Sequence, residues 1–230
     1  MKILNYLLII LLSIMSPDIV NDNHDSKKVK VLDLNGYHII TIKKNKMDFS
    51  VSEGVGKDFD FYVNSNFFTA ERKPTCGVVI DGKTKNRQIS GGGSFIVKNN
   101  KPNIVFNKVS NVEYLSQTHV WVIKNKNIND RMLNMNHAKK KVCRLLIGKN
   151  KNGEITIVHS NKGNGVTMRE LTNFALNNGV VDAFILDSGP SVEVFVKDGG
   201  YVYDFKSVND RQKTIVGIPK PVIYITGNFK

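Results

Sequence analysis

The stretch from Val142 to Val196 constrains the fold more than any other part of the chain. Within it, Asn152-Gly153 separates two strand-like runs, and an Asn-Gly pair in that position is a strong signal for a tight hairpin. A helix is predicted next, because Thr167–Glu170 has the form of a capping box and Gly179 offers a C-terminal stop. Val180–Leu186 is short, apolar and rich in valine, as a buried strand is. The predicted order is therefore strand, turn, strand, helix, strand.

A carboxylate stands directly after this buried strand, where Asp187 opens the loop Asp187–Ser191. Proteins that combine helices with a sheet often place reactive groups at the C-terminal end of a buried strand. We therefore expect Asp187 to act as a nucleophile or a general base. The alternative is a loop aspartate that accepts hydrogen bonds from backbone amides.

The rest of the chain consists mostly of short strand-like runs separated by turn residues. Between them, Asn125–Lys141 is polar and is predicted to be either a short helix or a surface loop. At 230 residues the chain is long enough for about one domain. We predict a single-domain α+β fold, in which one or a few helices pack on a large mixed or antiparallel sheet. The predicted strands are Val29–Leu34, Tyr37–Lys43, Met47–Val51, Phe59–Val63, Gly77–Ile80, Phe95–Val97, Asn103–Phe106, His119–Lys124, Val192–Val196, Tyr201–Phe205 and Val222–Thr226.

The N-terminus has the pattern of an export signal. Met1-Lys2 precedes the uncharged, Leu- and Ile-rich run Ile3–Met15, which has the length of a signal-peptide core. We predict a signal peptide or N-terminal anchor over residues 1–18, a linker over 19–28 and the domain over 29–230. A buried N-terminal helix is the alternative. The protein is then exported (secreted, periplasmic or at the cell surface), where Cys76 and Cys143 could form one disulfide. Cys143 could equally be a buried thiol.

The net charge of +13 favours an anionic partner, such as a phosphorylated glycan or a cell-envelope polymer. The alternative is lysine spread over a solvated surface. The chain has no long basic run and no recognisable nucleic-acid module, so no nucleic-acid partner is predicted. Membrane contact is expected only through the N-terminal segment. No Cys/His cluster indicates a metal site, and no cofactor is predicted.

Arg144 interrupts an otherwise apolar predicted strand, Val142–Gly148. A charged group in such a strand must reach a pocket, a partner carboxylate or solvent. Because guanidinium forms bidentate hydrogen bonds with phosphate oxygens, phosphate binding is one interpretation. An ion pair across the sheet is the other.

Four motifs in this order resemble those of the phosphodiester glycosidase family, and the resemblance extends roughly from Tyr62 to Ile225. A weaker fifth element, Asp210-Arg211, is similar to a late E-R-x-V-x-N motif. The four motifs are Asn64-Ser65-Asn66-Phe67-Phe68 for N-G-x-F-F, Arg144-Leu145-Leu146-Ile147-Gly148 for R-T-x-x-G, Gly165-Val166-Thr167-Met168-Arg169-Glu170-Leu171 for G-x-T-x-x-E-L, and Leu186-Asp187-Ser188-Gly189-Pro190-Ser191 for L-D-G-G-G-S.

The resemblance implies a hydrolase that cleaves a sugar-1-phosphodiester and releases sugar and phosphomonoester. The phosphate leaving group is already a stable anion, so such a site chiefly needs donors that hold the phosphate and a carboxylate that assists attack at the anomeric carbon. The resemblance implies a catalytic set and a substrate-binding set. The catalytic set is Asp187, Arg144 and Glu170; the substrate-binding set is Asn64, Asn66, Thr167, Gly189, Ser191 and Arg211.

The last loop departs from the family pattern, because Ser188 and Pro190 stand where the family has glycine. Proline has no N–H and so removes one backbone donor. The alternative hypothesis is therefore a non-catalytic binding module for anionic or phosphorylated glycans. Glu170 also has an alternative role in the capping box, and His159, at the end of a predicted strand, is a further candidate acid or base.

Overall fold

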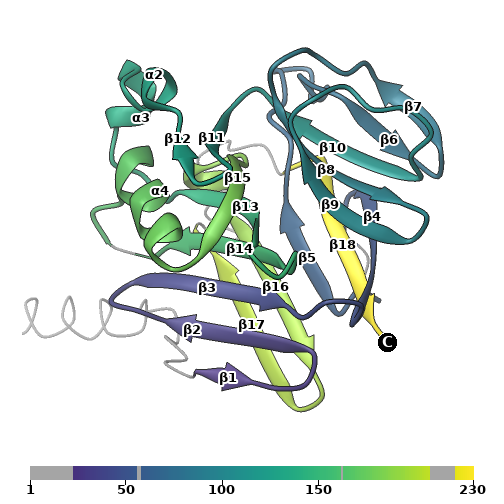
Figure 1. Cartoon of the computed structure of the whole chain (residues 1–230), viewed down its shortest axis with the longest axis horizontal. Coiled ribbons are helices and arrows are strands. Elements are labelled where there is room, and N and C mark those ends of the chain that lie inside the picture. The colour runs from purple at the N-terminus through teal and green to yellow at the C-terminus, as the bar shows by residue number, and fades with distance from the viewer. Residues whose placement is uncertain (1–22, 56–57, 162, 208–220) are drawn as a thin grey trace, which may run out of the picture.

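The computed structural model describes residues 23–55, 58–161, 163–207 and 221–230. It is mostly β: three antiparallel sheets, with three short α-helices in the described part of the chain (Figure 1). The prediction of one large sheet was therefore wrong, and the class is mostly β rather than α+β. The antiparallel pairing and the small number of helices are confirmed for the described residues. Alternating apolar residues locate strands along the chain, but they do not indicate which strands pair.

The first sheet has eight strands and carries the segment from which the prediction began. The hairpin at Asn152-Gly153 is confirmed: it joins two of the central strands, and Gly153 has a left-handed φ of +76°. The strand order is β1 (His24–Asp25), β2 (Val29–Asp33), β3 (Tyr37–Ile42), β14 (Ile155–Ser160), β13 (Leu145–Asn150), β15 (Val180–Ile185), β11 (Trp121–Lys124) and β12 (Asn127–Ile128).

The other two sheets have five strands each. The second sheet has the order β7 (Lys83–Asn86), β6 (Val78–Ile80), β10 (Tyr114–Thr118), β8 (Gly93–Lys98) and β9 (Lys101–Val105). The third has the order β17 (Tyr201–Lys206), β16 (Glu193–Asp198), β5 (Phe61–Asn64), β18 (Ile223–Phe229) and β4 (Met47–Glu53).

The main helix, α4 (Met168–Asn177), begins at the predicted capping box. Thr167 Oγ1 accepts a hydrogen bond from the Glu170 amide, and the Glu170 side chain accepts one from the Thr167 amide. One face of α4 packs its apolar side chains on the eight-stranded sheet. The polar segment Asn125–Lys141 forms β12 and two short helices, α2 (Asp130–Leu133) and α3 (Asn136–Lys139).

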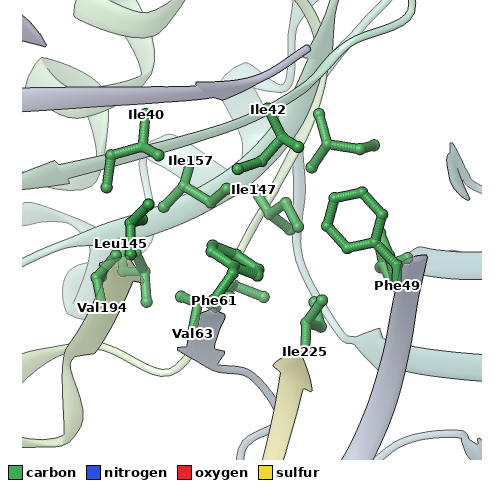
Figure 2. Packing of buried hydrophobic residues seen from close by; sticks show 14 of the residues in the cluster. Ile40, Ile42, Phe49, Phe61, Val63, Leu145, Ile147, Ile157, Val194 and Ile225 are labelled. Carbon is green, nitrogen blue, oxygen red and sulfur yellow. The ribbon is translucent and has the colours of Figure 1, made fainter. Parts of the chain in front are cut away.

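The main core lies where the three sheets face one another, and Figure 2 shows part of it. Strand residues alternate between the two faces of the first sheet. Leu145 and Ile147 belong to the core between the sheets, whereas Leu146 packs under α4. The eight-stranded sheet is therefore buried on both faces, which explains why its central strands are nearly continuous apolar runs.

The predicted signal or anchor segment, residues 1–18, lies outside the described residues. Of the predicted linker, His24 and Asp25 form β1, which pairs with β2. None of the helices in the described residues has the length and apolar character needed to cross a membrane. Cys76 and Cys143 are both free thiols.

Candidate functional site

Three of the four motifs meet where β14 and β15 end and the antiparallel strand β13 begins. Leu146 pairs with Ile185, and the Leu186 amide donates to the Leu145 carbonyl at 3.0 Å. Continuing this register brings the backbones of Arg144 and Asp187 opposite each other at the ends of the two strands. Arg144 also pairs with Ser160, whose amide donates to the Arg144 carbonyl at 3.0 Å and whose Oγ accepts from the Arg144 amide at 3.1 Å.

The Arg144 guanidinium is held by a helix end. Its Nη2 donates to the carbonyl oxygens of His137 at 2.7 Å and Lys140 at 2.8 Å, at the C-terminus of α3. The side chain is buried, and its Nε has no hydrogen-bond partner among the described residues. No carboxylate of those residues forms an ion pair with it. Burial lowers the pKa of Arg144, but an arginine remains charged at neutral pH. The guanidinium is therefore neutralised by carbonyl dipoles rather than by a carboxylate of the described residues.

Asp187 is anchored through its backbone. Its amide donates to the Ser65 carbonyl at 2.9 Å, and its carbonyl accepts from Asn64 Nδ2 at 3.0 Å. Its Oδ1 accepts from the Ser188 amide at 3.0 Å, as a loop aspartate commonly does. These bonds fix the start of the loop to β5 and to the segment that follows it.

Asn64 connects the first motif to the fourth. Besides its bond to Asp187, its Oδ1 accepts from the Glu193 amide at 2.8 Å, and the side chain is fully buried. Asn66 is also buried; its Nδ2 donates to the Gly77 carbonyl at 3.4 Å, while its Oδ1 has no partner among the described residues. Asn64 thus has a positioning geometry, and Asn66 keeps one acceptor oxygen unused.

The loop after Asp187 directs its backbone donors into the protein. The Gly189 amide donates to the Cys143 carbonyl at 2.7 Å, and the Gly189 carbonyl accepts from Ser207 Oγ at 2.7 Å. Pro190 has no N–H, and Gly189–Ser191 forms a single 3₁₀ turn with Ser191 buried. Of the loop amides, those of Ser188 and Gly189 are therefore already used.

A polar cavity of about 310 Å³ adjoins this loop. Arg144 and Asp187 do not line it, but Ser160 and Cys143 do, and these residues bond Arg144 and Gly189. Its polar lining includes Lys141, Cys143, Ser160, Asn161, Asn164 and Ser207. Ser207 follows β17 directly and lies outside all the sequence motifs, so those motifs do not predict its place at the cavity.

The glycine motif forms one wall of the cavity. Gly165 has a left-handed φ of +65°, and a Cβ there would lie 2.5 Å from the Val142 nitrogen. The motif continues as an isolated bridge between Val142 and Val166, which brings the start of α4 to the cavity. Glu170 is exposed, and its Oε2 accepts from the Thr167 amide at 2.7 Å and from Thr167 Oγ1 at 2.9 Å. Thr167 and Glu170 therefore lie near the site but bond each other.

Two buried histidines lie against Phe205, one of the residues that line the cavity. His38 and His159 stack with their ring centroids 4.8 Å apart, and His159 Nε2 lies 2.6 Å from the Tyr203 hydroxyl. Burial lowers the pKa of both imidazoles. Burial also raises the pKa of the Cys143 thiol to about 12, which makes it a poor nucleophile at neutral pH.

Arg211 lies outside the described residues. Within the described ranges, no group of three His, Cys, Asp or Glu side chains is placed to hold a metal ion. The structure thus brings Arg144, Asp187, Asn64, Gly189 and Ser191 to one edge of the fold, with Thr167 and Glu170 beside it.

Comparison with known proteins gives one family match. The model of the family described as phosphodiester glycosidase matches residues 58–220, which is more than half of the chain. No curated protein matches the sequence.

Solved structures share the fold at low sequence identity. The zebrafish N-acetylglucosamine-1-phosphodiester alpha-N-acetylglucosaminidase catalytic domain, auto-inhibited by its pro-peptide, superposes with a TM-score of 0.61 at 15% identity, covering 88% of this chain and 77% of that one. A hypothetical protein from Synechocystis superposes with a TM-score of 0.61 at 12% sequence identity, and the match covers 90% of this chain and 64% of that one. A protein from Burkholderia pseudomallei whose name calls it exported superposes with a TM-score of 0.53 at 9% sequence identity. The match covers 87% of this chain and 74% of that one.

Proposed function

The chain belongs to the phosphodiester glycosidase family, and from that premise we propose that it is an exported hydrolase of sugar-1-phosphodiesters. It cleaves the glycosidic bond to phosphate and releases sugar and phosphomonoester. The observation that supports the proposal is the sheet register, which brings the backbones of Arg144 and Asp187 to neighbouring strand ends close to a polar cavity. Its substrate is a phosphorylated glycan or a cell-envelope polymer.

In the proposed mechanism Asp187 assists the attack of water at the anomeric carbon. Its half-buried carboxylate stands on a loop that backbone bonds to Ser65 and Asn64 hold in place, so little reorganisation is needed when the substrate binds. The reaction needs little protonation of the leaving oxygen, because a phosphomonoester is already a stable anion. This suits a site whose two nearby histidines are buried and have lowered pKa values.

Arg144 supplies positive charge for the phosphate, and Arg211 is proposed to assist it. The guanidinium Nη2 is occupied by carbonyls, so Arg144 acts first through its charge, which no carboxylate of the described residues neutralises. Glu170 is proposed as a second carboxylate at the start of α4. Asn66, Thr167, Gly189 and Ser191 are proposed to contact the substrate, while Asn64 positions the loop.

The test is release of sugar and phosphomonoester from a panel of sugar-1-phosphodiesters, with wild type beside Asp187→Asn. Asparagine keeps an oxygen that can accept the Ser188 amide, so the variant should fold and lose at least about 10³-fold in turnover. A matched control is Asp182→Asn, since Asp182 lies in β15 and pairs with Lys149 at 3.3 Å, outside the site. Normal turnover by Asp187→Asn would contradict the assignment.

One observation favours a second candidate, a binding module for anionic or phosphorylated glycans. The amides of Ser188 and Gly189 bond within the protein, and Pro190 has none, so the loop offers few donors to a transition state. Salt-sensitive glycan binding, with no product from wild type or variant, would establish this alternative.

A further inference from the structure

A second cavity lies at the far end of the eight-stranded sheet from the candidate site. It has a volume of about 570 Å³, within the range of small-molecule sites. Ile155, at the start of β14, lines this cavity, and Ser160, at the end of the same strand, lines the other one. Five residues of extended strand span about 17 Å, so the two cavities are separate.

The floor of this second cavity combines one end of the main apolar core with Ile96, which belongs to a smaller apolar cluster. Ile42, Met47, Phe49, Ile96 and Ile155 line it, and each is less than 9% exposed. Figure 2 shows Ile42 and Phe49 toward the same end of the packed cluster. An apolar ligand segment that entered here would extend an existing core rather than meet polar atoms.

The rim of the cavity is cationic. Four lysines and one glutamate line it, and Lys43 is already paired with Asp25 at 2.7 Å. Lys44 and Lys101 are exposed, and their ammonium groups have no hydrogen bond or ion pair within the described ranges. The Lys98 ammonium has one weak hydrogen bond there, at 3.5 Å. Desolvating these ammonium groups over an apolar floor would favour a ligand that brings a negative charge.

The rim is also preformed by tight turns. Asn45 and Asn99 have left-handed φ angles of +60° and +51°, and Gly153 one of +76°. Three hairpin turns from different parts of the chain therefore hold the lysines around the opening, and a ligand need not pay the full cost of ordering loops.

We propose that this cavity binds an amphipathic anion: a single alkyl chain that ends in a phosphate monoester. The chain lies on the apolar floor, and the phosphate lies between Lys44, Lys98 and Lys101. This binding is independent of the proposed hydrolase site, because none of the residues at that site lines this cavity.

The test is calorimetric titration with decyl phosphate below its micelle concentration, beside decanol and inorganic phosphate. We expect one saturable site for decyl phosphate, and at least about tenfold weaker binding of either fragment. No saturable binding of decyl phosphate, or equally tight binding of inorganic phosphate, would overturn the proposal.

A matched pair of double variants assigns the site. Lys44→Gln/Lys101→Gln should weaken decyl phosphate binding about tenfold, through loss of two rim charges. Lys83→Gln/Lys197→Gln removes the same charge from exposed strand positions that do not line the cavity, and should change binding less than about twofold. An equal loss in both double variants would indicate nonspecific attraction and overturn the site.

Vesicles of phosphatidylcholine with phosphatidic acid separate a single bound molecule from a membrane surface. If Lys44→Gln/Lys101→Gln weakened vesicle binding while free decyl phosphate bound neither protein, the occupant would be a bilayer and the proposal would be wrong. Turnover on sugar-1-phosphodiesters should be the same in both double variants, so failure here and failure of the hydrolase proposal are distinguishable.

Discussion

At the scale of single residues, Asn64 shows how one buried amide fixes the geometry of a loop. Its two polar atoms bond the backbone of Asp187 and Glu193, which are far from it in sequence. Arg144 is similar, since its guanidinium is held by two helix-end carbonyls rather than by a carboxylate. Both side chains position the candidate site through backbone groups.

Asn64→Ala should destabilise the protein by about 2 to 3 kcal/mol, because it leaves the Asp187 carbonyl and the Glu193 amide without their partner in a buried site. The free energy of unfolding in urea measures the change. Asn127→Ala is the control and should stay within about 0.5 kcal/mol of wild type. Asn127 is exposed, and its side chain makes one hydrogen bond, at 3.3 Å, within the described part of the chain. Similar values for the two variants would contradict a positioning role for Asn64.

At the scale of elements, the loop that leads into α4 depends on one glycine. Gly165→Ala should destabilise the protein by at least about 2 kcal/mol, because a Cβ there meets the Val142 backbone and φ is left-handed. Gly163→Ala should be nearly neutral, since nothing lies within 4 Å of that position. Thermal unfolding of both variants measures the difference, and an unaltered melting temperature in Gly165→Ala would contradict the loop geometry.

The elements were the part of the fold that the sequence predicted best. The capping box correctly predicted the start of α4, and Asn152-Gly153 correctly predicted the central hairpin. Each of these signals depends only on neighbouring residues and indicates a single local structure. Arg144 was predicted to need a partner, but its carbonyl partners on α3 were not, since the segment Asn125–Lys141 had no clear periodicity.

At the scale of the whole molecule, the arrangement of sheets could not be predicted. β3 pairs with β14 more than a hundred residues later, and β18 inserts between β5 and β4. Such pairings depend on tertiary packing rather than on local pattern. For the same reason the cavity residue Ser207 and the stack of His38 on His159 were not anticipated.

The histidine stack makes the contact between two sheets sensitive to pH. His38 and His159 project from the eight-stranded sheet toward Tyr203 and Phe205 of β17, and burial lowers the pKa of both imidazoles. The negative charge of Asp33 raises the pKa of His38, but burial lowers it by more. Just below pH 6.5 the unfolded chain therefore binds protons that the folded chain does not, so stability falls as pH falls through that value.

We expect the free energy of unfolding to fall between pH 7.5 and pH 5.0, by up to about 1.4 kcal/mol per pH unit for each proton. His38→Phe should reduce this slope, because it removes one buried imidazole that has no hydrogen-bond partner in the described structure. His119→Gln, at an exposed position, should leave it unchanged. Equal slopes in wild type and His38→Phe would contradict the account.

The most direct test of the proposed glycosidase reaction is to determine which product receives the oxygen atom of water. Hydrolysis of a sugar-1-phosphodiester in ¹⁸O-labelled water, with mass spectrometry of both products, shows which bond breaks. Attack at the anomeric carbon beside Asp187 predicts label in the sugar and none in the phosphomonoester. Label in the phosphomonoester would mean attack at phosphorus, and the assignment of this site as a glycosidase would be wrong.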